Sequence, residues 1–311
     1  MSVWSGSEFV ALSLPPLLIG TLAAVACTLP GNFLVLRRQA LIGDAISHVV
    51  LPGIVAAFLI TGQVATWPMM MGAGGAALIA VGLIELVQRL GRIEPGAAMG
   101  VVFTALFAAG VLLLELSDTS GVHLDVDHAL YGNLESLIWL DAAGWQSIVD
   151  PVALSTLPPE LPRIALVTLV ISVLTWVFWR PLKISTFDES FARTSGFPVT
   201  AVSMGLVISA ALAAVAAFDA VGSIIVIAMF ICPPAAARLI APSLERQVAL
   251  SIVFACISAV AGYMIAGYGP LLLGSPNAVS AAGMIATTSG LVLGFAVAVS
   301  LRRQSRGRQT A

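Results

Sequence analysis

The sequence predicts an all-α fold, a polytopic membrane helix bundle of about nine transmembrane helices, with roughly eight to ten compatible with the apolar pattern. Of the 311 residues, 59% are hydrophobic and only 10% are charged, whereas an average soluble domain is about 25% charged. The mean hydropathy is +1.02, and long apolar segments recur along the whole chain. This composition excludes a soluble globular enzyme, a disordered chain and a nucleic-acid binder, because none of these can bury so much apolar surface or act with so few charges.

The predicted membrane spans follow one another through a single domain, residues 1–311. A helix that crosses a bilayer needs about 20 mainly apolar residues. The segments that approach or exceed this length are Leu14–Leu36, Ala45–Ile60, Trp67–Val87, Ala97–Leu114, Ile164–Trp179, Val199–Phe218, Val221–Ile240, Val248–Ala266 and Ala281–Leu301. The less apolar stretch Leu134–Leu154 carries Asp141 and Asp150, so we expect a loop there that contains a surface or re-entrant helix.

The basic residues alternate with the spans. Lysine and arginine follow the first, third, fifth, seventh and ninth spans, so all but Arg163 of the 14 basic residues lie on one side of the membrane. The positive-inside rule makes that side cytoplasmic. We therefore expect the N-terminus outside the cell, the C-terminus in the cytoplasm, and residues 302–311 as a basic cytoplasmic tail.

Two ionisable residues stand at the start of the second span, Asp44 just before it and His48 within it. Asp44 and His48 are four residues apart and therefore share one face of a helix. His48 follows Arg38 by about 15 Å of helix, which places the pair near the middle of the membrane. A carboxylate and an imidazole are suitable ligands for a divalent cation. A proton relay and a purely structural pair are the alternatives. Pro52 frees the carbonyl of His48, which could line a pathway, or it provides a kink for packing.

An outer loop carries a second group of candidate ligands. His123, Asp125, Asp127 and His128 alternate with other residues, so an extended segment could place several of them along one edge. The alternative is a solvated acidic loop or a docking surface for a partner protein.

Two cytoplasmic segments are candidates for docking a partner. Ser185–Pro198 is predicted to form a polar helix that stops at Gly196 and Pro198. Pro233 and Pro234 are expected to interrupt the seventh span, because proline breaks a helix. Residues 233–246 would then form a short amphipathic helix at the cytoplasmic surface. An ordinary connection between helices is the alternative.

Catalytic motifs are absent from the sequence. There is no Gly-Lys dipeptide, so the phosphate-binding motif G-x-x-x-x-G-K-[ST] is missing, and H-E-x-x-H is missing as well. We therefore expect a protein that is not an enzyme and does not itself hydrolyse ATP.

Four segments in this order resemble the permease subunit of ABC-type manganese, zinc and iron importers. They are residues 38–53, the outer stretch 124–133, the segment from Thr186 to Gly196, and residues 221–239 with their double proline. The resemblance implies that Asp44 and His48 contact the transported metal. It implies that residues 233–246 are the coupling helix that docks on the ATPase, with contacts from Pro233, Pro234, Ala237, Arg238, Leu239, Ser243 and Leu244.

The resemblance also implies a complete transporter in the bacterial plasma (inner) membrane. Its expected partners are a cytoplasmic ABC ATPase, an extracytoplasmic metal-binding protein, a second copy or a related sister permease, and membrane lipids, with no nucleic acid. Mn²⁺ is the favoured cargo, with Zn²⁺ or Fe²⁺ as alternatives, and no permanently bound cofactor is expected. The expected function is import by alternating access, and a proton-coupled secondary metal transporter is the alternative.

Overall fold

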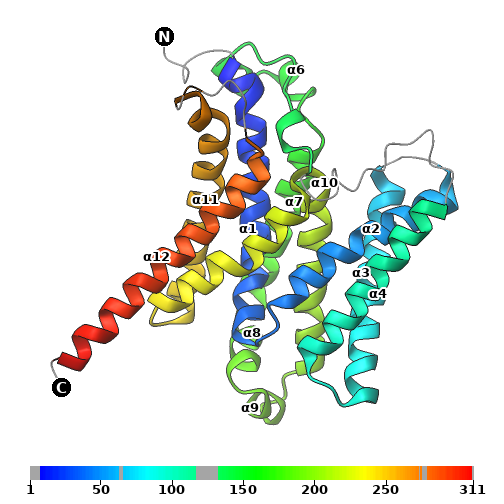
Figure 1. Ribbon diagram of the computed structural model, residues 1–311, viewed down its shortest axis with the longest axis vertical. Helices are drawn as coiled ribbons and strands as arrows, with labels where there is room; N and C mark the ends of the chain where they lie inside the picture. The colour runs from blue at the N-terminus through cyan, green and yellow to red at the C-terminus, as the bar shows by residue number, and fades with distance from the viewer. Residues whose placement is uncertain (1–7, 63–65, 117–131, 273, 275–278, 310–311) are drawn as a thin grey trace.

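The computed structural model is a tilted bundle of membrane-length helices (Figure 1). It describes residues 8–62, 66–116, 132–272, 274 and 279–309, and within these ranges the regular structure is entirely helical. The two termini lie at opposite ends of the bundle in Figure 1. That arrangement is what an odd number of membrane crossings requires.

The helices follow the apolar segments of the sequence. The long helices are α1 (Leu14–Leu36, preceded by the π-turn η1, Phe9–Ser13), α2 (Leu41–Thr61), α3 (Thr66–Gly91), α4 (Pro95–Leu116), α7 (Glu160–Val177), α10 (Val199–Ile240), α11 (Leu244–Leu272) and α12 (Ala281–Gln309). The short helices are η2 (Leu134–Ser136), η3 (Trp145–Ile148), α6 (Pro151–Leu154), α8 (Trp179–Phe187) and α9 (Glu189–Thr194). Within the described residues, 9 helical segments are long and apolar enough to cross a membrane, which confirms the predicted number.

The sixth and seventh spans are the two halves of α10, which bends sharply between them (Figure 1). Gly222 at the bend has φ 74° and ψ 172°, a backbone conformation that only glycine adopts readily. The bend interrupts helical pairing, and the backbone N–H of Asn133 donates to the carbonyl of Ala220 at 3.2 Å. Gly132 packs directly on the backbone of Val221 and Gly222. Gly132 and Asn133 therefore fix the bend.

The double proline does not break α10, which corrects the prediction of a separate helix over 233–246. The helix continues through Pro233 and Pro234 to Ile240. Pro233 has no N–H for the carbonyl of Met229, and the hydroxyl of Thr28 on α1 donates to that oxygen at 2.9 Å instead. A neighbouring helix thus replaces the missing donor, as membrane helices with proline require.

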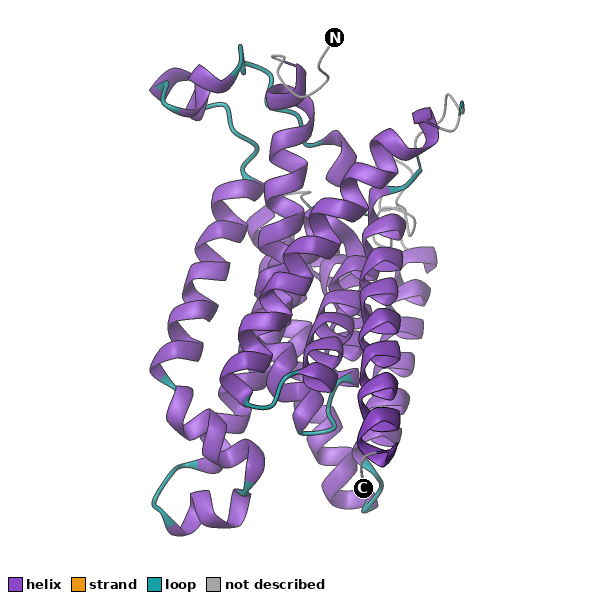
Figure 2. Ribbon diagram, turned by 90° about the vertical axis from the view of Figure 1, so that its left-hand side faces the viewer, coloured by secondary structure: helices purple, strands orange, loops and turns teal. Residues whose placement is uncertain are grey.

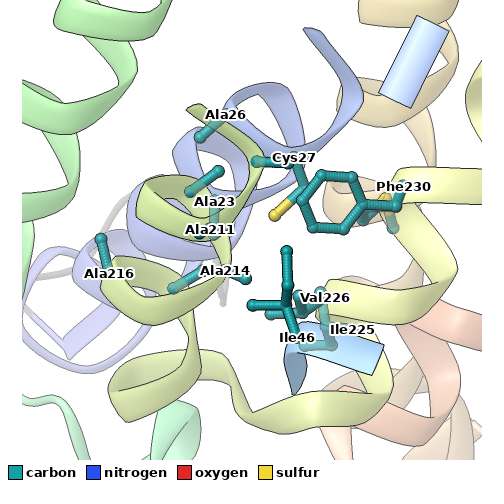
Figure 3. Packing of buried hydrophobic residues seen from close by; sticks show 14 of the residues in the cluster. Ala23, Ala26, Cys27, Ile46, Ala211, Ala214, Ala216, Ile225, Val226 and Phe230 are labelled. Atoms are coloured by element: carbon teal, nitrogen blue, oxygen red, sulfur yellow. The ribbon is translucent and has the colours of Figure 1, made fainter. Parts of the chain in front are cut away.

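Small side chains bring the central helices together. Figure 3 shows Ala23, Ala26 and Cys27 of α1 facing alanines of the first half of α10, while the Phe230 ring lies beside Cys27. Gly31 lies against the Phe230 carbonyl, where a Cβ would come within 2.5 Å of the oxygen. Lipid supplies no hydrophobic drive between helices, so such close packing stabilises the core.

The segment before α7 covers the N-terminal end of the bundle. Trp139 is buried, donates from Nε1 to the Ala153 carbonyl at 2.7 Å, and packs with Val10. Its backbone N–H donates to the Ala11 carbonyl at 2.9 Å. The expected loop with short surface helices is therefore present, and Figure 2 shows it projecting beyond the long helices. At the other end, α12 carries the helical conformation on to Gln309, into the predicted tail.

Candidate functional site

Asp44 and His48 form a contacting pair at the start of α2. Asp44 lies in the first turn of the helix, and the Nε2 atom of His48 is 3.3 Å from the Oδ1 atom of Asp44. The helix begins at Leu41, so His48 stands about 10 Å along it. The side chains of His48 and Asp44 are 28% and 23% exposed. The pair is therefore accessible on the surface of a single chain.

Close glycine contacts hold α2 in position around this pair. Gly43, next to Asp44, lies under the Phe230 ring of α10, where a Cβ would come within 2.7 Å of the ring atoms. Further along, Gly53 packs on the backbone of Gly72 in α3. Any larger residue at Gly43 or Gly53 would push α2 away from α10 or α3. These two glycines therefore determine where α2 places Asp44.

Two aromatic rings of α4 enclose His48. The Phe103 ring stacks on the imidazole with centroids 5.4 Å apart and 18° between planes. The Phe107 ring meets it edge-on at 5.6 Å and 76°. Sequence reasoning missed both residues, although they share the four-residue spacing of Asp44 and His48. Together the rings restrict the imidazole to an orientation in which Nε2 faces Asp44.

Pro52 serves packing as well as freeing a carbonyl. Its ring is buried against Gly110 of α4, where a Cβ would come within 2.6 Å of it. Proline has no N–H to donate to the carbonyl of His48. The site therefore offers a carboxylate oxygen and an imidazole nitrogen, and the His48 carbonyl lacks the helical donor that residue 52 would otherwise supply.

The pair is not a complete metal site by itself. In the part of the chain that the structure describes, no group of three or more His, Cys, Asp and Glu side chains converges. Zn²⁺ typically takes four ligands, and Mn²⁺ favours carboxylate, carbonyl and water in higher coordination. The second group of candidate ligands, His123, Asp125, Asp127 and His128, lies outside the described residues.

A cavity with a mixed, mainly apolar lining lies on another face of α2. Ile42, Ala45 and Ile46 line it from α2, and the helical repeat places them away from Asp44 and His48. Its polar lining comes from the α1–α2 turn, α3 and α10 and consists of Gln39, Glu85, Gln88, Thr200 and Ser203. The cavity therefore lies between the start of α2 and the beginning of α10.

The residues predicted to couple to an ATPase divide into two groups. Pro233, Pro234, Ala237 and Leu244 are buried among the helices and unavailable for contact with another protein. Arg238 and Leu239 are exposed at the end of α10, and Ser243 is half-buried in the turn before α11. Only the second group can belong to a docking surface.

The helices α8 and α9 form a projecting hairpin at the C-terminal end of the bundle (Figures 1 and 2). Asp188 caps α9 by accepting from the Phe191 N–H at 2.8 Å. Phe187 and Phe191 are 58% and 57% exposed. A salt bridge of 2.6 Å between Lys183 Nζ and Glu245 Oε1 connects the hairpin to the start of α11. Sequence reasoning recognised this segment as a polar helix but did not single out its two aromatic residues.

The fold and the site define a class of protein. Long apolar helices cross a membrane, and one of them carries a carboxylate–imidazole pair; buried or pathway-facing charges in such helices are typical of transport proteins. The model of the ABC 3 transport family matches residues 11–149 and 152–286. The chain belongs to this family, and it is a multi-pass membrane permease of the ABC type.

Named relatives agree with this assignment. The chain is 40% identical over 250 residues to the manganese transport system membrane protein MntD of Bacillus subtilis, which covers 79% of this chain and 81% of that one. It is 37% identical over 222 residues to the zinc transport system membrane protein TroD of Treponema pallidum, covering 71% of this chain and 58% of that one. Among solved structures, PsaBC from Streptococcus pneumoniae in complex with Fab aligns with a TM-score of 0.68 and 27% identity, over 91% of this chain and 89% of that one.

Proposed function

We propose that this permease imports a divalent metal ion, with Mn²⁺ favoured, and that Asp44 and His48 bind the ion in transit. The observation that carries the proposal is their 3.3 Å contact on a membrane-spanning helix, partly exposed and oriented by Phe103. A carboxylate offers a hard oxygen and an imidazole a borderline nitrogen. The family relatives named for manganese and zinc transport support this cargo class.

A second permease copy completes the site. One chain supplies two side-chain ligands on a face that is open at its surface. Two copies related by a two-fold axis would bring two carboxylates and two imidazoles together, because a two-fold interface joins the same patch of both subunits. A related sister permease with the same pair would satisfy the same chemistry. Within the described part of the chain no cysteine joins Asp44 and His48 in a cluster of ligands, and a site without thiolate favours Mn²⁺ over softer ions.

A cytoplasmic ABC ATPase drives the cycle in this proposal. Its docking surface consists of Phe187 and Phe191 on the α8–α9 hairpin together with Arg238 and Leu239 at the end of α10. All four side chains are exposed, and Lys183 and Glu245 join the two parts through their salt bridge. ATP binding moves this surface and opens the permease to the outside, where an extracytoplasmic binding protein delivers the metal. Hydrolysis returns the transporter to its inward state.

The test measures ATP-dependent uptake of radioactive ⁵⁴Mn²⁺ in vesicles that contain the permease, its ATPase and its binding protein. We expect Asp44→Asn and His48→Gln to reduce uptake to background while the variants remain in the membrane and bind the ATPase. Glu94→Gln is the matched control, because Glu94 is an exposed carboxylate in the turn between α3 and α4 and not on α2. Normal uptake by both site variants would remove the assignment. Uptake that follows a proton gradient without ATP would favour a secondary transporter instead.

A further inference from the structure

Arg37 connects three separate elements through its guanidinium group. It follows α1 and is half-buried. Its Nη2 donates to Ser185 Oγ at 2.8 Å and its Nε to Thr186 Oγ1 at 3.1 Å, both on α8. Its Nη1 donates to Ser203 Oγ at 2.8 Å on α10. A planar guanidinium holds its donors in a fixed fork, so the three bonds set the relative orientation of the three elements.

The hydroxyl of Ser185 is itself fixed as an acceptor. It donates its own proton to the Pro181 carbonyl at 2.6 Å, within α8, so its lone pairs are directed at Arg37. The side chain of Ser185 is also buried. This end of the network is therefore rigid and belongs to the hairpin that carries α9.

The charge environment extends the connection to α9. Burial lowers the pKa of the Arg37 guanidinium, and the negative charge of Glu189 on α9 offsets part of this effect. The desolvated cation is thus compensated by hydroxyl oxygens at close range and by a carboxylate of the hairpin further away. Moving the α8–α9 hairpin away from the bundle would weaken the bonds from Arg37 to Ser185 and Thr186 as well as the attraction of Glu189.

The other end of the network reaches the cavity between α2, α3 and α10. Ser203 lines this cavity together with Ala45 and Ile46, the two residues that directly follow Asp44 on α2. Arg37 therefore stands between the exposed hairpin and the cavity wall next to the metal-binding helix. Arg38, the following residue, is exposed and has φ 58°.

We propose that Arg37 is the positioning residue that transmits movement of the α8–α9 hairpin to α10 and the cavity beside α2. This inference rests on the proposed function, because it assumes that the hairpin docks an ATPase. Arg37 itself binds neither the metal nor the ATPase. It holds the hairpin at one fixed place on the permease. A displacement of the hairpin therefore displaces the part of α10 that carries Ser203 and lines the cavity.

The first experiment measures the attachment of the hairpin in the full-length permease alone. Trypsin cleavage after Arg193 on α9 is followed by mass spectrometry in detergent. We expect Arg37→Gln to accelerate this cleavage about tenfold, because the open state of a locally released segment becomes more populated. Arg38→Gln removes the same charge and should leave the rate at the wild-type value. An unchanged cleavage rate in Arg37→Gln would show that Arg37 does not hold the α8–α9 hairpin on the bundle.

The second experiment measures metal ions transported per ATP hydrolysed in the reconstituted complex with its ATPase and binding protein. We expect this ratio to fall about tenfold in Arg37→Gln, a loss within the usual range of coupling between sites. Ser203→Ala removes one acceptor only and should lower the ratio less, which keeps the test valid if Arg37→Gln folds poorly. A merely structural role would instead reduce transport and hydrolysis in proportion.

The outcomes separate this inference from the proposed function. If the wild-type complex transports metal with ATP and both variants keep its ratio of metal to ATP, the coupling role of Arg37 is wrong and the proposed function stands. If the wild-type complex shows no ATP-driven uptake, the proposed function and the coupling role both fail, whatever the cleavage rates are.

Discussion

The hydroxyl of Thr28 donates a hydrogen bond of 2.9 Å to the carbonyl of Met229, which lies four residues before Pro233. The two residues are 201 positions apart in the sequence, and Thr28 is fully buried. This bond satisfies the carbonyl that Pro233 leaves open, at the point where α10 passes through its double proline. It also joins α1 to the half of α10 that follows the Gly222 bend.

The first prediction concerns this bond. Thr28→Val keeps the shape of the side chain and removes the donor, which leaves the Met229 carbonyl unpaired in a buried place. We expect a loss of about 1–3 kcal/mol in the free energy of unfolding, measured by denaturation in detergent micelles. Thr104→Val is the control, because the exposed Thr104 hydroxyl donates to the Gly100 carbonyl within its own helix. Equal stability of the two variants would show that another donor forms a hydrogen bond to the Met229 carbonyl when Thr28 is replaced.

The second prediction compares two glycines inside helices. Gly31→Ala places a Cβ within 2.5 Å of the Phe230 carbonyl, whereas a Cβ at Gly74 meets nothing within 4 Å. We expect Gly31→Ala to destabilise the protein by about 1–3 kcal/mol through overpacking and Gly74→Ala to leave the stability nearly unchanged. Thermal unfolding of the purified variants checks the difference. A Gly31→Ala protein as stable as Gly74→Ala would mean that α1 and α10 are not in close contact.

The third prediction concerns the aromatic enclosure of His48. Phe103→Leu and Phe107→Leu keep apolar bulk but remove the rings that orient the imidazole. We expect the Mn²⁺ concentration for half-maximal uptake to rise about tenfold, because groups that orient a metal ligand typically affect affinity by that order. Phe295→Leu is the control, since Phe295 is an exposed ring on α12. An unchanged concentration dependence in both variants would remove the orienting role.

The fourth prediction concerns metal binding without transport. Mn²⁺ at 100 times its dissociation constant should stabilise the folded permease by about 2.7 kcal/mol, since it binds the native state only. Thermal unfolding with and without Mn²⁺ measures this, and a chelator should reverse the shift. Asp44→Asn should abolish the shift, and Glu94→Gln should retain it. A shift of equal size in Asp44→Asn would place the ion elsewhere.

The sequence was sufficient to predict the membrane spans, because hydropathy depends on composition along a segment and little on its neighbours. It also predicted that Asp44 and His48 share one face of the helix, because a separation of four residues fixes this in any helix; the structure brings them to 3.3 Å. The orientation of the chain across the membrane and the roles of His123, Asp125, Asp127 and His128 remain predictions from the sequence.

The sequence was misleading where distant residues override a local rule. Proline breaks an isolated helix, yet Pro233 and Pro234 lie inside α10. At Pro233 the missing donor is supplied from another helix by Thr28. The burial of Ala237 and Leu244 follows from the same continuous packing. Phe103 and Arg37 showed no motif in the sequence, since their roles depend on partners brought close only by the fold.

The open carbonyls of the spanning helices also imply an order of assembly during synthesis. The donors for Met229 and Ala220 are Thr28 and Asn133, which leave the ribosome before α10 does. The carbonyl of Ala266, four residues before Pro270 in α11, accepts instead from Val279, which is made later. Because chains fold from the N-terminus as they are made, the donors Thr28 and Asn133 have already been synthesised when α10 enters the membrane. By contrast, α11 stays incomplete until the residues that lead into α12 have been translated.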